Sequence, residues 1–297
     1  MMTKKISVIV PTYNRVSLLE KTLVALVGQK FPANDFEIIV CDDGSTDSTR
    51  ELVRIFSKNY KNPEIVYLHQ KNRGPAASRN LGIKESKASI IAMTDDDCQP
   101  DRDWLKTIWQ GFQANSKAVE LSGITYTKKD KITPFTHQID NSEPWSFPTC
   151  NLACQKILLE KINGFDEKFP FTNEDADLSW RIEAEGRVVH LSQMRVLHPP
   201  RPTTFMKNLK TIKYLESEFL LQEKMPEEYK KRKINPYREI LFVHGLKIGA
   251  KKIIRFSGWI FKNPFLYVKL IILIITERLY LLFLLPGFMW RHWQRSI

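Results

Sequence analysis

Short apolar runs alternate with amphipathic stretches through the first third of the chain. Each run has the length of a strand, and each stretch repeats its apolar residues every three or four positions, as one face of a helix does. Four strand-then-helix pairs in succession predict a parallel sheet covered by helices, which is an α/β architecture. The pairs, strand first, are ISVIV and SLLEKTLVALVGQ, EIIVC and STRELVRIFSKNY, EIVYL and GPAASRNLGIKES, and ASIIAM and DWLKTIWQGF.

A polar segment follows each predicted strand, and two of these segments are acidic. DDGSTD begins at Asp42, and TDDDC contains Asp95, Asp96 and Asp97. Ligands of parallel α/β sheets bind beyond the carboxyl ends of the strands, so both clusters are expected at one sheet edge. Buried like charges oppose folding unless a cation or a hydrogen-bonding ligand offsets them. Carboxylate oxygens favour hard divalent cations, which makes the DDD run a candidate metal site; the alternative is a solvated turn.

The net charge of +12 is concentrated in one part of the 297-residue chain. From Arg201 onward there are 19 Lys and Arg against 7 Asp and Glu, so the part before it is neutral. This asymmetry predicts a balanced domain followed by a basic segment that meets a phospholipid surface or nucleic acid. Nucleic acid is disfavoured because the aromatic residues of the segment lie among aliphatic runs. The N-terminal run ISVIV is too short for a signal peptide or a spanning helix, which favours a cytoplasmic location.

Four cysteines, Cys41, Cys98, Cys150 and Cys154, occur without a CxxC pair, so we expect reduced thiols and no zinc site. Cys98 adjoins the DDD run, but a thiolate suits softer metals, so we do not expect it to bind the hard cation. Cys150 and Cys154 are four positions apart, a spacing that would let them pack on one helix face.

Five segments, in order, resemble glycosyltransferase family 2 over roughly residues 6–200. They are ISVIVPTYNR, EIIVCDDGSTDST, NRGPAASRNLGI, IIAMTDDDCQPDRDWL, and INGFDEKF followed by NEDADLSWRIEAEG. The resemblance implies a GT-A fold with a Rossmann-like nucleotide half and an acceptor half, and an enzyme that inverts the anomeric carbon of a nucleotide sugar. The chain has no GxGxxG and no P-loop motif, which disfavours dinucleotide-dependent dehydrogenases and P-loop enzymes.

The resemblance assigns nucleotide-binding roles to residues at the ends of the predicted strands: Thr12, Tyr13, Asp43, Arg79, Asp95 and Asp96. Asp43 would accept a hydrogen bond from the base, and Arg79 would approach the base or the diphosphate. Asp95 and Asp97 match the family's DxD pair, which touches ribose and metal, and His198 is a candidate third metal ligand. The alternatives are that Tyr13 caps the sheet, that Arg79 pairs with a surface carboxylate and that His198 is structural.

The expected chemistry needs a cation for the leaving group and a base for the acceptor. A nucleoside diphosphate leaves with growing negative charge, which Mg²⁺ or Mn²⁺ held by Asp97 would stabilise. The acceptor hydroxyl needs a base on the opposite face of the sugar. In the family's ED motif this base is the aspartate, here Asp175, and burial beside Glu174 would raise its pKa. The alternative is a helix start whose acidic residues favour the macrodipole.

The acceptor side carries fewer signals. The candidates are Phe165, Asp166, Glu174 and Trp180, although aromatic residues are more often part of the core. The QxxRW motif of processive family members is absent, which predicts transfer of one sugar per binding event.

The basic segment is predicted to be helical. Four basic residues fall on one face of an amphipathic helix over residues 247–262, of a type that lies in a membrane interface: Lys247, Lys251, Arg255 and Lys262. Three charged residues interrupt the apolar stretch that follows: Lys269, Glu277 and Arg278. Spanning a bilayer needs roughly 20 mostly apolar residues, so we expect two helices on or partly in the membrane. The alternatives are burial against the catalytic domain and a homodimer.

Together these patterns predict a GT-A domain over residues 1–205 and a basic, membrane-associated helical region over residues 206–297. We expect a metal-dependent, inverting glycosyltransferase that moves a sugar from a nucleoside-diphosphate sugar, with a UDP-sugar favoured, to a hydroxyl of a glycan or lipid-linked acceptor in cell-surface polysaccharide synthesis. It would lie on the inner face of the cytoplasmic membrane. The alternatives are a non-catalytic membrane-surface protein and a sugar-phosphate nucleotidyltransferase, whose Gly-rich N-terminal loop is missing from VIVPTYNR.

Overall fold

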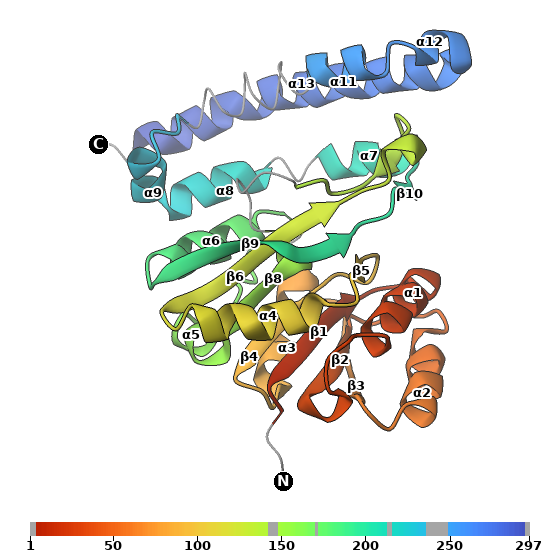
Figure 1. Ribbon diagram of the computed structural model, residues 1–297. Coiled ribbons are helices and arrows are strands. Elements are labelled where there is room, and N and C mark those ends of the chain that lie inside the picture. Colours follow the sequence, from red (N-terminus) through yellow and green to blue (C-terminus); the bar gives the residue numbers. More distant parts are fainter. Residues whose placement is uncertain (1–3, 142–147, 170–171, 213–215, 236–248, 295–297) are drawn as a thin grey trace. The chain divides into compact units, whose positions relative to one another are not determined.

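The computed structural model describes residues 4–141, 148–169, 172–212, 216–235 and 249–294 (Figure 1). The chain forms two compact units. Unit 1 comprises Met1–Thr127 and Gln138–Pro199, and unit 2 comprises Lys128–His137 and Pro200–Ile297. The ten residues Lys128–His137, which precede the boundary predicted after residue 205, thus group with the C-terminal segment. The predicted division itself stays a prediction.

Unit 1 begins with the four predicted strand-then-helix pairs, and all four are confirmed. They are β1 (Ile6–Thr12) with α1 (Val16–Val27), β2 (Phe36–Asp42) with α2 (Thr49–Asn59), β3 (Glu64–His69) with α3 (Pro75–Glu85), and β4 (Ile90–Met93) with α4 (Trp104–Ala114). These strands lie in the order β3-β2-β1-β4 and pair in parallel. Their carboxyl ends therefore open on one edge of the sheet, as expected.

The same sheet continues with strands of mixed direction. The order beyond β4 is β8 (Leu152–Gln155), β6 (Ala118–Tyr126), β9 (Arg187–Leu197) and β5 (Gln99–Pro100). β8 is antiparallel to both neighbours, β6 and β9 are parallel, and β5 is antiparallel to β9. Helices α5 (Lys156–Lys161) and α6 (Glu174–Glu183) and a short 3₁₀ turn at Thr149–Asn151 complete the second half. A further 3₁₀ turn, Ala33–Asp35, precedes β2.

Helices cover both faces of the sheet, and β1, β2 and β4 are buried over almost their whole length, which explains why these strands read as continuous apolar runs. One face packs against α1, α2 and α4 through residues such as Val8, Leu19 and Trp104. The other face packs against α3, α5 and α6 through residues such as Ile9 and Leu178. The result is an α/β sheet flanked by helices on either side.

Gly82 sets the distance between α3 and the sheet. A Cβ at this position would lie 2.7 Å from Cγ2 of Ile9 and 2.8 Å from Sγ of Cys41, closer than side-chain atoms approach one another. The helix therefore rests directly on β1 and β2. Arg79 lies on the same helix, three residues earlier.

All four cysteines are buried and free, as expected. The shared helix face predicted for Cys150 and Cys154 is wrong, because Cys150 lies in the 3₁₀ turn Thr149–Asn151 and Cys154 lies in β8. The two thiols pack into the hydrophobic clusters on opposite faces of the sheet. The spacing of four misled the prediction because a turn and a strand, rather than a helix, separate the two residues.

Unit 2 is mostly helical. It contains a 3₁₀ turn (Lys129–Lys131), the short antiparallel pair β7 (Thr136–His137) and β10 (Arg201–Pro202), and the helices α7 (Phe205–Thr211), α8 (Glu216–Lys224), α9 (Pro226–Lys231), α11 (Gly249–Arg255), α12 (Trp259–Lys262) and α13 (Pro264–Gln294). Its core gathers apolar side chains of α13, α11 and the β7 segment, including Phe135, Leu270 and Leu273. In the described parts of the chain, every helix is too short or too polar to cross a membrane.

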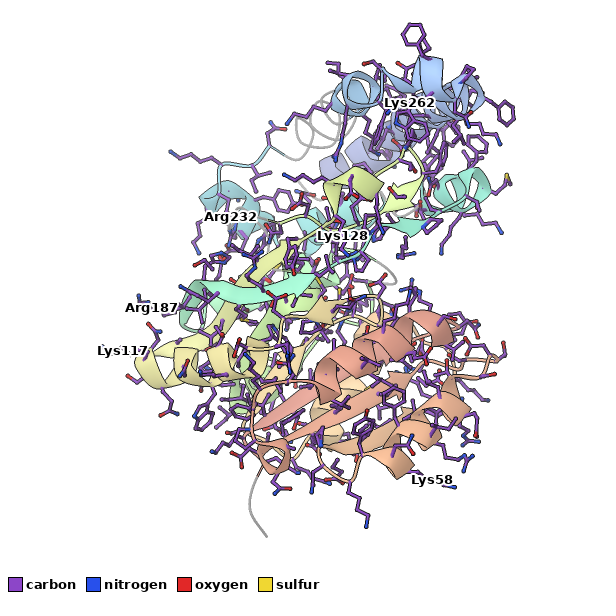
Figure 2. The ribbon with its side chains drawn as sticks, turned by 45° about the vertical axis from the view of Figure 1, so that its right-hand side comes forward. Lys58, Lys117, Lys128, Arg187, Arg232 and Lys262 are labelled. Carbon is purple, nitrogen blue, oxygen red and sulfur yellow. The ribbon has the colours of Figure 1, made fainter. Side chains whose placement is uncertain are left out.

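The single amphipathic helix predicted over residues 247–262 is wrong. Residues 247–248 lie outside the described residues, and the remainder forms α11 and α12 with a break between Arg255 and Trp259. Ser257 and Gly258 lie in this break, and both residue types are poor helix formers. Figure 2 labels Lys262 at the end of α12.

Candidate active site at the carboxyl ends of the strands

Hydrogen bonds tie together the loops that follow β1 and β2. The amide Oδ1 of Asn14, a residue with a positive φ of 52°, accepts from the backbone N–H of Thr46 at 2.8 Å. In return, the backbone N–H of Asn14 donates to Oγ of Ser45 at 2.8 Å. The Asp47 carboxylate accepts from the backbone N–H and from Oγ1 of Thr49, the first residue of α2. These contacts hold the loops after β1 and β2 together at the carboxyl ends of the two strands.

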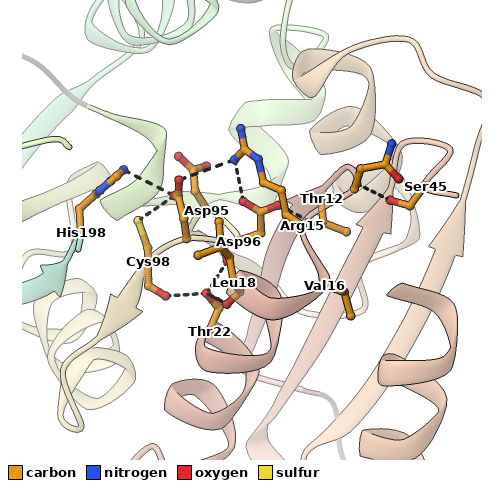
Figure 3. Close-up of polar contacts among 12 residues, drawn as sticks. Thr12, Arg15, Val16, Leu18, Thr22, Ser45, Asp95, Asp96, Cys98 and His198 are labelled. Atoms are coloured by element: carbon orange, nitrogen blue, oxygen red, sulfur yellow. Dashed lines mark hydrogen bonds and ion pairs between the residues drawn. The ribbon is translucent and has the colours of Figure 1, made fainter. Parts of the chain in front are cut away.

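The middle carboxylate of the DDD run is held from β1. Asp96 accepts from Oγ1 of Thr12 at 2.8 Å and from Nη1 of Arg15 at 2.9 Å, as Figure 3 shows. Burial raises the pKa of Asp96 to about 6, although the Arg15 cation opposes the shift. Sequence reasoning missed Arg15; its position next to the PTYN segment, at the same sheet edge as the acids, was the available signal.

The last carboxylate of the run meets a histidine from the other half of unit 1. Nε2 of His198, directly after β9, lies 3.5 Å from Oδ1 of Asp97, and Nη1 of Arg15 lies 3.6 Å from Oδ2. Ligand atoms of Asp97, Cys98 and His198 all lie within 4.8 Å of one another. A carboxylate and an imidazole converging in a buried site fit a divalent cation. The structure thus brings together two of the three predicted metal ligands, Asp97 and His198.

The first carboxylate of the run is joined to α6 through a buried arginine. Nη2 of Arg79 lies 2.9 Å from Oδ1 of Asp95, and its Nη1 lies 3.2 Å from Oε1 of Glu174. The guanidinium also lies over the ring of Phe165, 5.4 Å from its centroid. Arg79 was expected either to approach a ligand or to pair with a surface carboxylate. It pairs with the partly exposed Asp95 and the buried Glu174, and its Nε has no hydrogen-bond partner. Its approach to a ligand stays a prediction.

The predicted base lies in the first turn of α6. Asn173, in the left-handed region with φ of 66°, precedes the helix and directs its first turn. The Asp175 side chain keeps partial exposure and accepts from the N–H of Ala176 at 2.8 Å. Its packed surroundings and the adjacent Glu174 charge raise the pKa of Asp175 to about 6. Asp177, in the same turn, is fully buried and pairs with Arg181 at 2.6 Å.

Asp43 is engaged by the turn ahead of α3. Its carboxylate accepts from the backbone N–H groups of Arg73 at 2.9 Å and Gly74 at 2.8 Å, and from Nε2 of Gln70 at 2.7 Å. It therefore holds the start of α3 in place, whatever it contributes to a ligand. Tyr13, at the end of β1, is 46% exposed, so its ring is accessible to one.

The acceptor-side candidates differ in accessibility. Phe165 is buried against Arg79, and its N–H donates to Oδ1 of Asn80 at 2.8 Å. Asp166 accepts from the N–H of Lys168 at 2.9 Å and, like Trp180 on α6, is partly exposed. Their roles toward an acceptor stay predictions.

Comparisons with known proteins agree on one family. Residues 7–177 match the family described as Glycosyl transferase family 2. The chain is similar to glycosyltransferase AglE of Haloferax volcanii, with 41% identity over 101 residues, which is 34% of this chain and 33% of that protein. The match thus spans only a third of this relative's length.

Two solved structures resemble the chain in fold. S. aureus TarS 1-349 in complex with UDP-GlcNAc aligns with a TM-score of 0.56 and 19% identity, over 76% of this chain and 73% of that one. Mannosyltransferase PcManGT from Pyrobaculum calidifontis, in complex with GDP-Man and Mn²⁺, aligns with a TM-score of 0.62 and 18% identity, over 94% of this chain and 88% of that one. At these identities the likeness concerns the fold.

Proposed function

Because the chain belongs to glycosyltransferase family 2, we propose that it transfers a sugar from a nucleoside-diphosphate sugar to a hydroxyl of a glycan acceptor, with inversion at the anomeric carbon. The fold is of the GT-A type, and the activity class is that of a nucleotide-sugar glycosyltransferase. The observation that carries the proposal is the gathering of acidic residues at one end of the sheet. Arg79 pairs with Asp95 and with Glu174, the residue before Asp175, and His198 lies beside Asp97.

The donor is proposed to bind along the ends of β1, β2 and β4. Thr12, Tyr13 and Asp43 would line the nucleotide pocket, and Asp95 and Asp96 would lie near the ribose. A UDP-sugar is the proposed donor, since TarS is described in complex with UDP-GlcNAc. The complex of PcManGT with GDP-Man and Mn²⁺ keeps a GDP-sugar as the alternative.

Asp97 and His198 would hold Mg²⁺ or Mn²⁺, which when bound supplies positive charge to the departing diphosphate. The chain adds its own positive charge there, because Arg15 lies 3.6 Å from Asp97 and is held by Asp96 at 2.9 Å. The side chains that would hold the cation, and Arg15 beside them, are placed before the donor arrives. They therefore need little reorganisation as negative charge develops on the leaving group.

Asp175 would take the proton of the acceptor hydroxyl at its carboxylate. A pKa of about 6 leaves this carboxylate ionised at neutral pH, yet makes it a stronger base than an ordinary aspartate. Arg79 fixes the neighbouring Glu174 and so sets the start of α6 from which Asp175 projects. Phe165, Asp166, Glu174 and Trp180 would shape the acceptor side.

The experiment is to compare the Asp175→Asn variant with the wild-type protein for nucleotide release from a panel of UDP- and GDP-sugars, with Mn²⁺ and an acceptor mixture. The variant should lose turnover, because its proton acceptor is removed. It should still bind the nucleotide, which calorimetry measures. Glu185→Gln, an exposed residue just after α6 that pairs with Lys161, is the matched control and should turn over normally. Normal turnover by Asp175→Asn would overturn the assignment of the base.

The exposed face of α13 supports a membrane surface as a partner in the same reaction. Apolar residues project from this face at intervals of three and four over about 27 Å of helix: Phe265, Val268, Ile272, Ile275, Leu279 and Leu282. The charged residues of this stretch, Lys269, Glu277 and Arg278, are only partly exposed. Lys269 flanks the face, with its ammonium 4.2 Å from the centroid of the Phe265 ring. So long an apolar strip is unusual on a monomer. The whole net positive charge of the chain lies in the same part of the sequence, which suits the anionic inner leaflet.

Vesicle sedimentation tests this partner. The protein should bind phosphatidylglycerol vesicles more strongly than phosphatidylcholine vesicles, and Leu279→Glu should release it. Ile157→Glu, which adds the same charge at a 73% exposed position on α5, is the control and should still bind. If the wild-type protein ignores vesicles and light scattering shows a dimer that Leu279→Glu dissociates, the face belongs to a homodimer instead. Docking on this surface would suit a lipid-linked acceptor of cell-surface polysaccharide synthesis.

A further inference from the structure

The thiol of Cys98 lies inside the candidate metal centre. Its Sγ is 3.9 Å from Oδ1 of Asp97, the same oxygen that lies 3.5 Å from Nε2 of His198. Cys98 and His198 are 0% and 1% exposed, and dashed lines in Figure 3 mark a contact made by each of these two side chains. Three kinds of metal ligand, an oxygen, a nitrogen and a sulfur, therefore converge in a buried site.

The register of two strands explains why these residues meet. β5 and β9 pair antiparallel with Gln99 opposite Leu197, so Cys98, one residue before, lies opposite His198, one residue after. The turn that carries Cys98 is fixed, because its N–H donates to the carbonyl of Asp95 at 3.1 Å and Oγ1 of Thr22 donates to its carbonyl at 2.7 Å. The sulfur is thus placed by backbone pairing and not by a mobile loop.

The separations suit one shared cation. In a tetrahedral site with metal–sulfur bonds of about 2.3 Å and metal–nitrogen or metal–oxygen bonds of about 2.0–2.2 Å, ligand atoms lie roughly 3.3–3.7 Å apart. The 3.5 Å between Nε2 of His198 and Oδ1 of Asp97 lies within this range. The 3.9 Å between Sγ of Cys98 and the same oxygen reaches it after a small side-chain rotation. A sulfur ligand favours softer cations over Mg²⁺, which prefers a shell of oxygens.

We infer that Cys98 is a third protein ligand of this centre, with Asp97 and His198, and that the centre prefers thiophilic divalent cations such as Zn²⁺ and Co²⁺ to Mg²⁺. The fourth position is left for water or a phosphate oxygen. When the cation binds, the metal–sulfur bond forms and the Cys98 thiol releases its proton to the solvent. The inference rests on the proposed function only in placing a metal at Asp97.

The experiment uses the full chain, reduced and free of nucleotide, titrated with Co²⁺ alone. Cobalt bound through sulfur gives a near-ultraviolet charge-transfer band, and we expect this band to saturate at one Co²⁺ per chain and to disappear when Zn²⁺ is added. Mg²⁺ in large excess should not remove it. If calorimetry shows that Co²⁺ binds but the band is absent, the sulfur ligand is excluded.

Variants assign the sulfur. Cys98→Ser should lose the band, while Cys150→Ser and Cys41→Ser should retain it. Cys150 is the critical comparison, because its sulfur, that of Cys98 and an oxygen of Asp95 also lie within 4.8 Å of one another. Loss of the band in Cys150→Ser alone would overturn the inference.

Sugar transfer with Mn²⁺ is measured separately, so the two proposals can fail independently. A missing cobalt band leaves the proposed function intact, and a missing transfer activity leaves the sulfur ligand intact.

Discussion

Replacing Arg79 with methionine should destabilise unit 1, because it removes the buried cation that pairs with two carboxylates. The guanidinium lies 2.9 Å from Asp95 and 3.2 Å from Glu174, and Arg79 and Glu174 are 4% and 7% exposed. Methionine keeps most of the volume and none of the charge. Leaving a buried ion without its partner costs about 3–5 kcal/mol. For a unit of this size that corresponds to a fall in Tm of roughly 6–20 °C.

Thermal unfolding followed by circular dichroism measures this loss, and a double-mutant cycle assigns it. Glu174→Gln alone should cost less than Arg79→Met, because Arg79 keeps Asp95 as a partner. The coupling between the two substitutions should be about 1–3 kcal/mol. Arg54→Met is the control; its pairing with Glu51 is solvent-exposed, so its Tm should not change.

The same variant makes a second, independent prediction about acid–base chemistry. The positive charge of Arg79 lowers the pKa of Asp175 against the effects of burial and Glu174, so its removal should raise that pKa. The acid limb of the rate profile should then move to higher pH in Arg79→Met. The reasoning is refuted if Arg79→Met unfolds at the same temperature as Arg54→Met and keeps the wild-type pH profile.

Three further predictions concern Asp175, Glu120 and Gly123 of unit 1. The transfer rate of the wild-type protein should fall below about pH 6, because a base with that pKa becomes protonated there and stops accepting protons; a pH–rate profile measures this. Burial raises the pKa of Glu120 to about 8, so the folded chain keeps a proton that the unfolded chain releases, and stability falls as pH rises toward that value. Glu120→Gln removes this dependence, so it should raise the Tm at about pH 9 and change it little at about pH 5; equal shifts at both would contradict this. A Cβ on Gly123 would lie 1.9 Å from the carbonyl oxygen of Met194, so Gly123→Ala should lower the free energy of unfolding by about 3 kcal/mol. Gly258→Ala, where no atom lies within 4 Å, should be neutral.

The sequence predicted the first half of unit 1 well because its strands are buried on both faces and leave an unambiguous pattern. The position of the acids after β2 and β4 followed from the same pattern, since parallel strands share one open edge. The second half was less accessible. β8 is only the four residues Leu152–Gln155 and runs antiparallel between β4 and β6, and so short a strand has no periodicity to read.

The missed parts of the site depend on contacts between distant segments. The role of Arg15 depends on how the loop after β1 turns toward Asp96. The location of Cys98 opposite His198 depends on the pairing of β5 with β9, two strands whose register local sequence does not specify. The helix break near Ser257 and Gly258 could have been expected from their low helix propensity, but the periodicity of the basic residues outweighed it.

Gly82 shows how a position without chemistry can govern a reaction. Any side chain there would lift α3 from the strands beneath it, and Arg79, one turn earlier on that helix, would be displaced with it. A random library screened for lost activity should therefore recover inactive variants at this glycine, together with those at the reactive groups. Such variants would show that the reaction depends on the distance between α3 and the sheet. Smaller residues at position 9 or 41 should restore their activity, whereas added metal or donor should not.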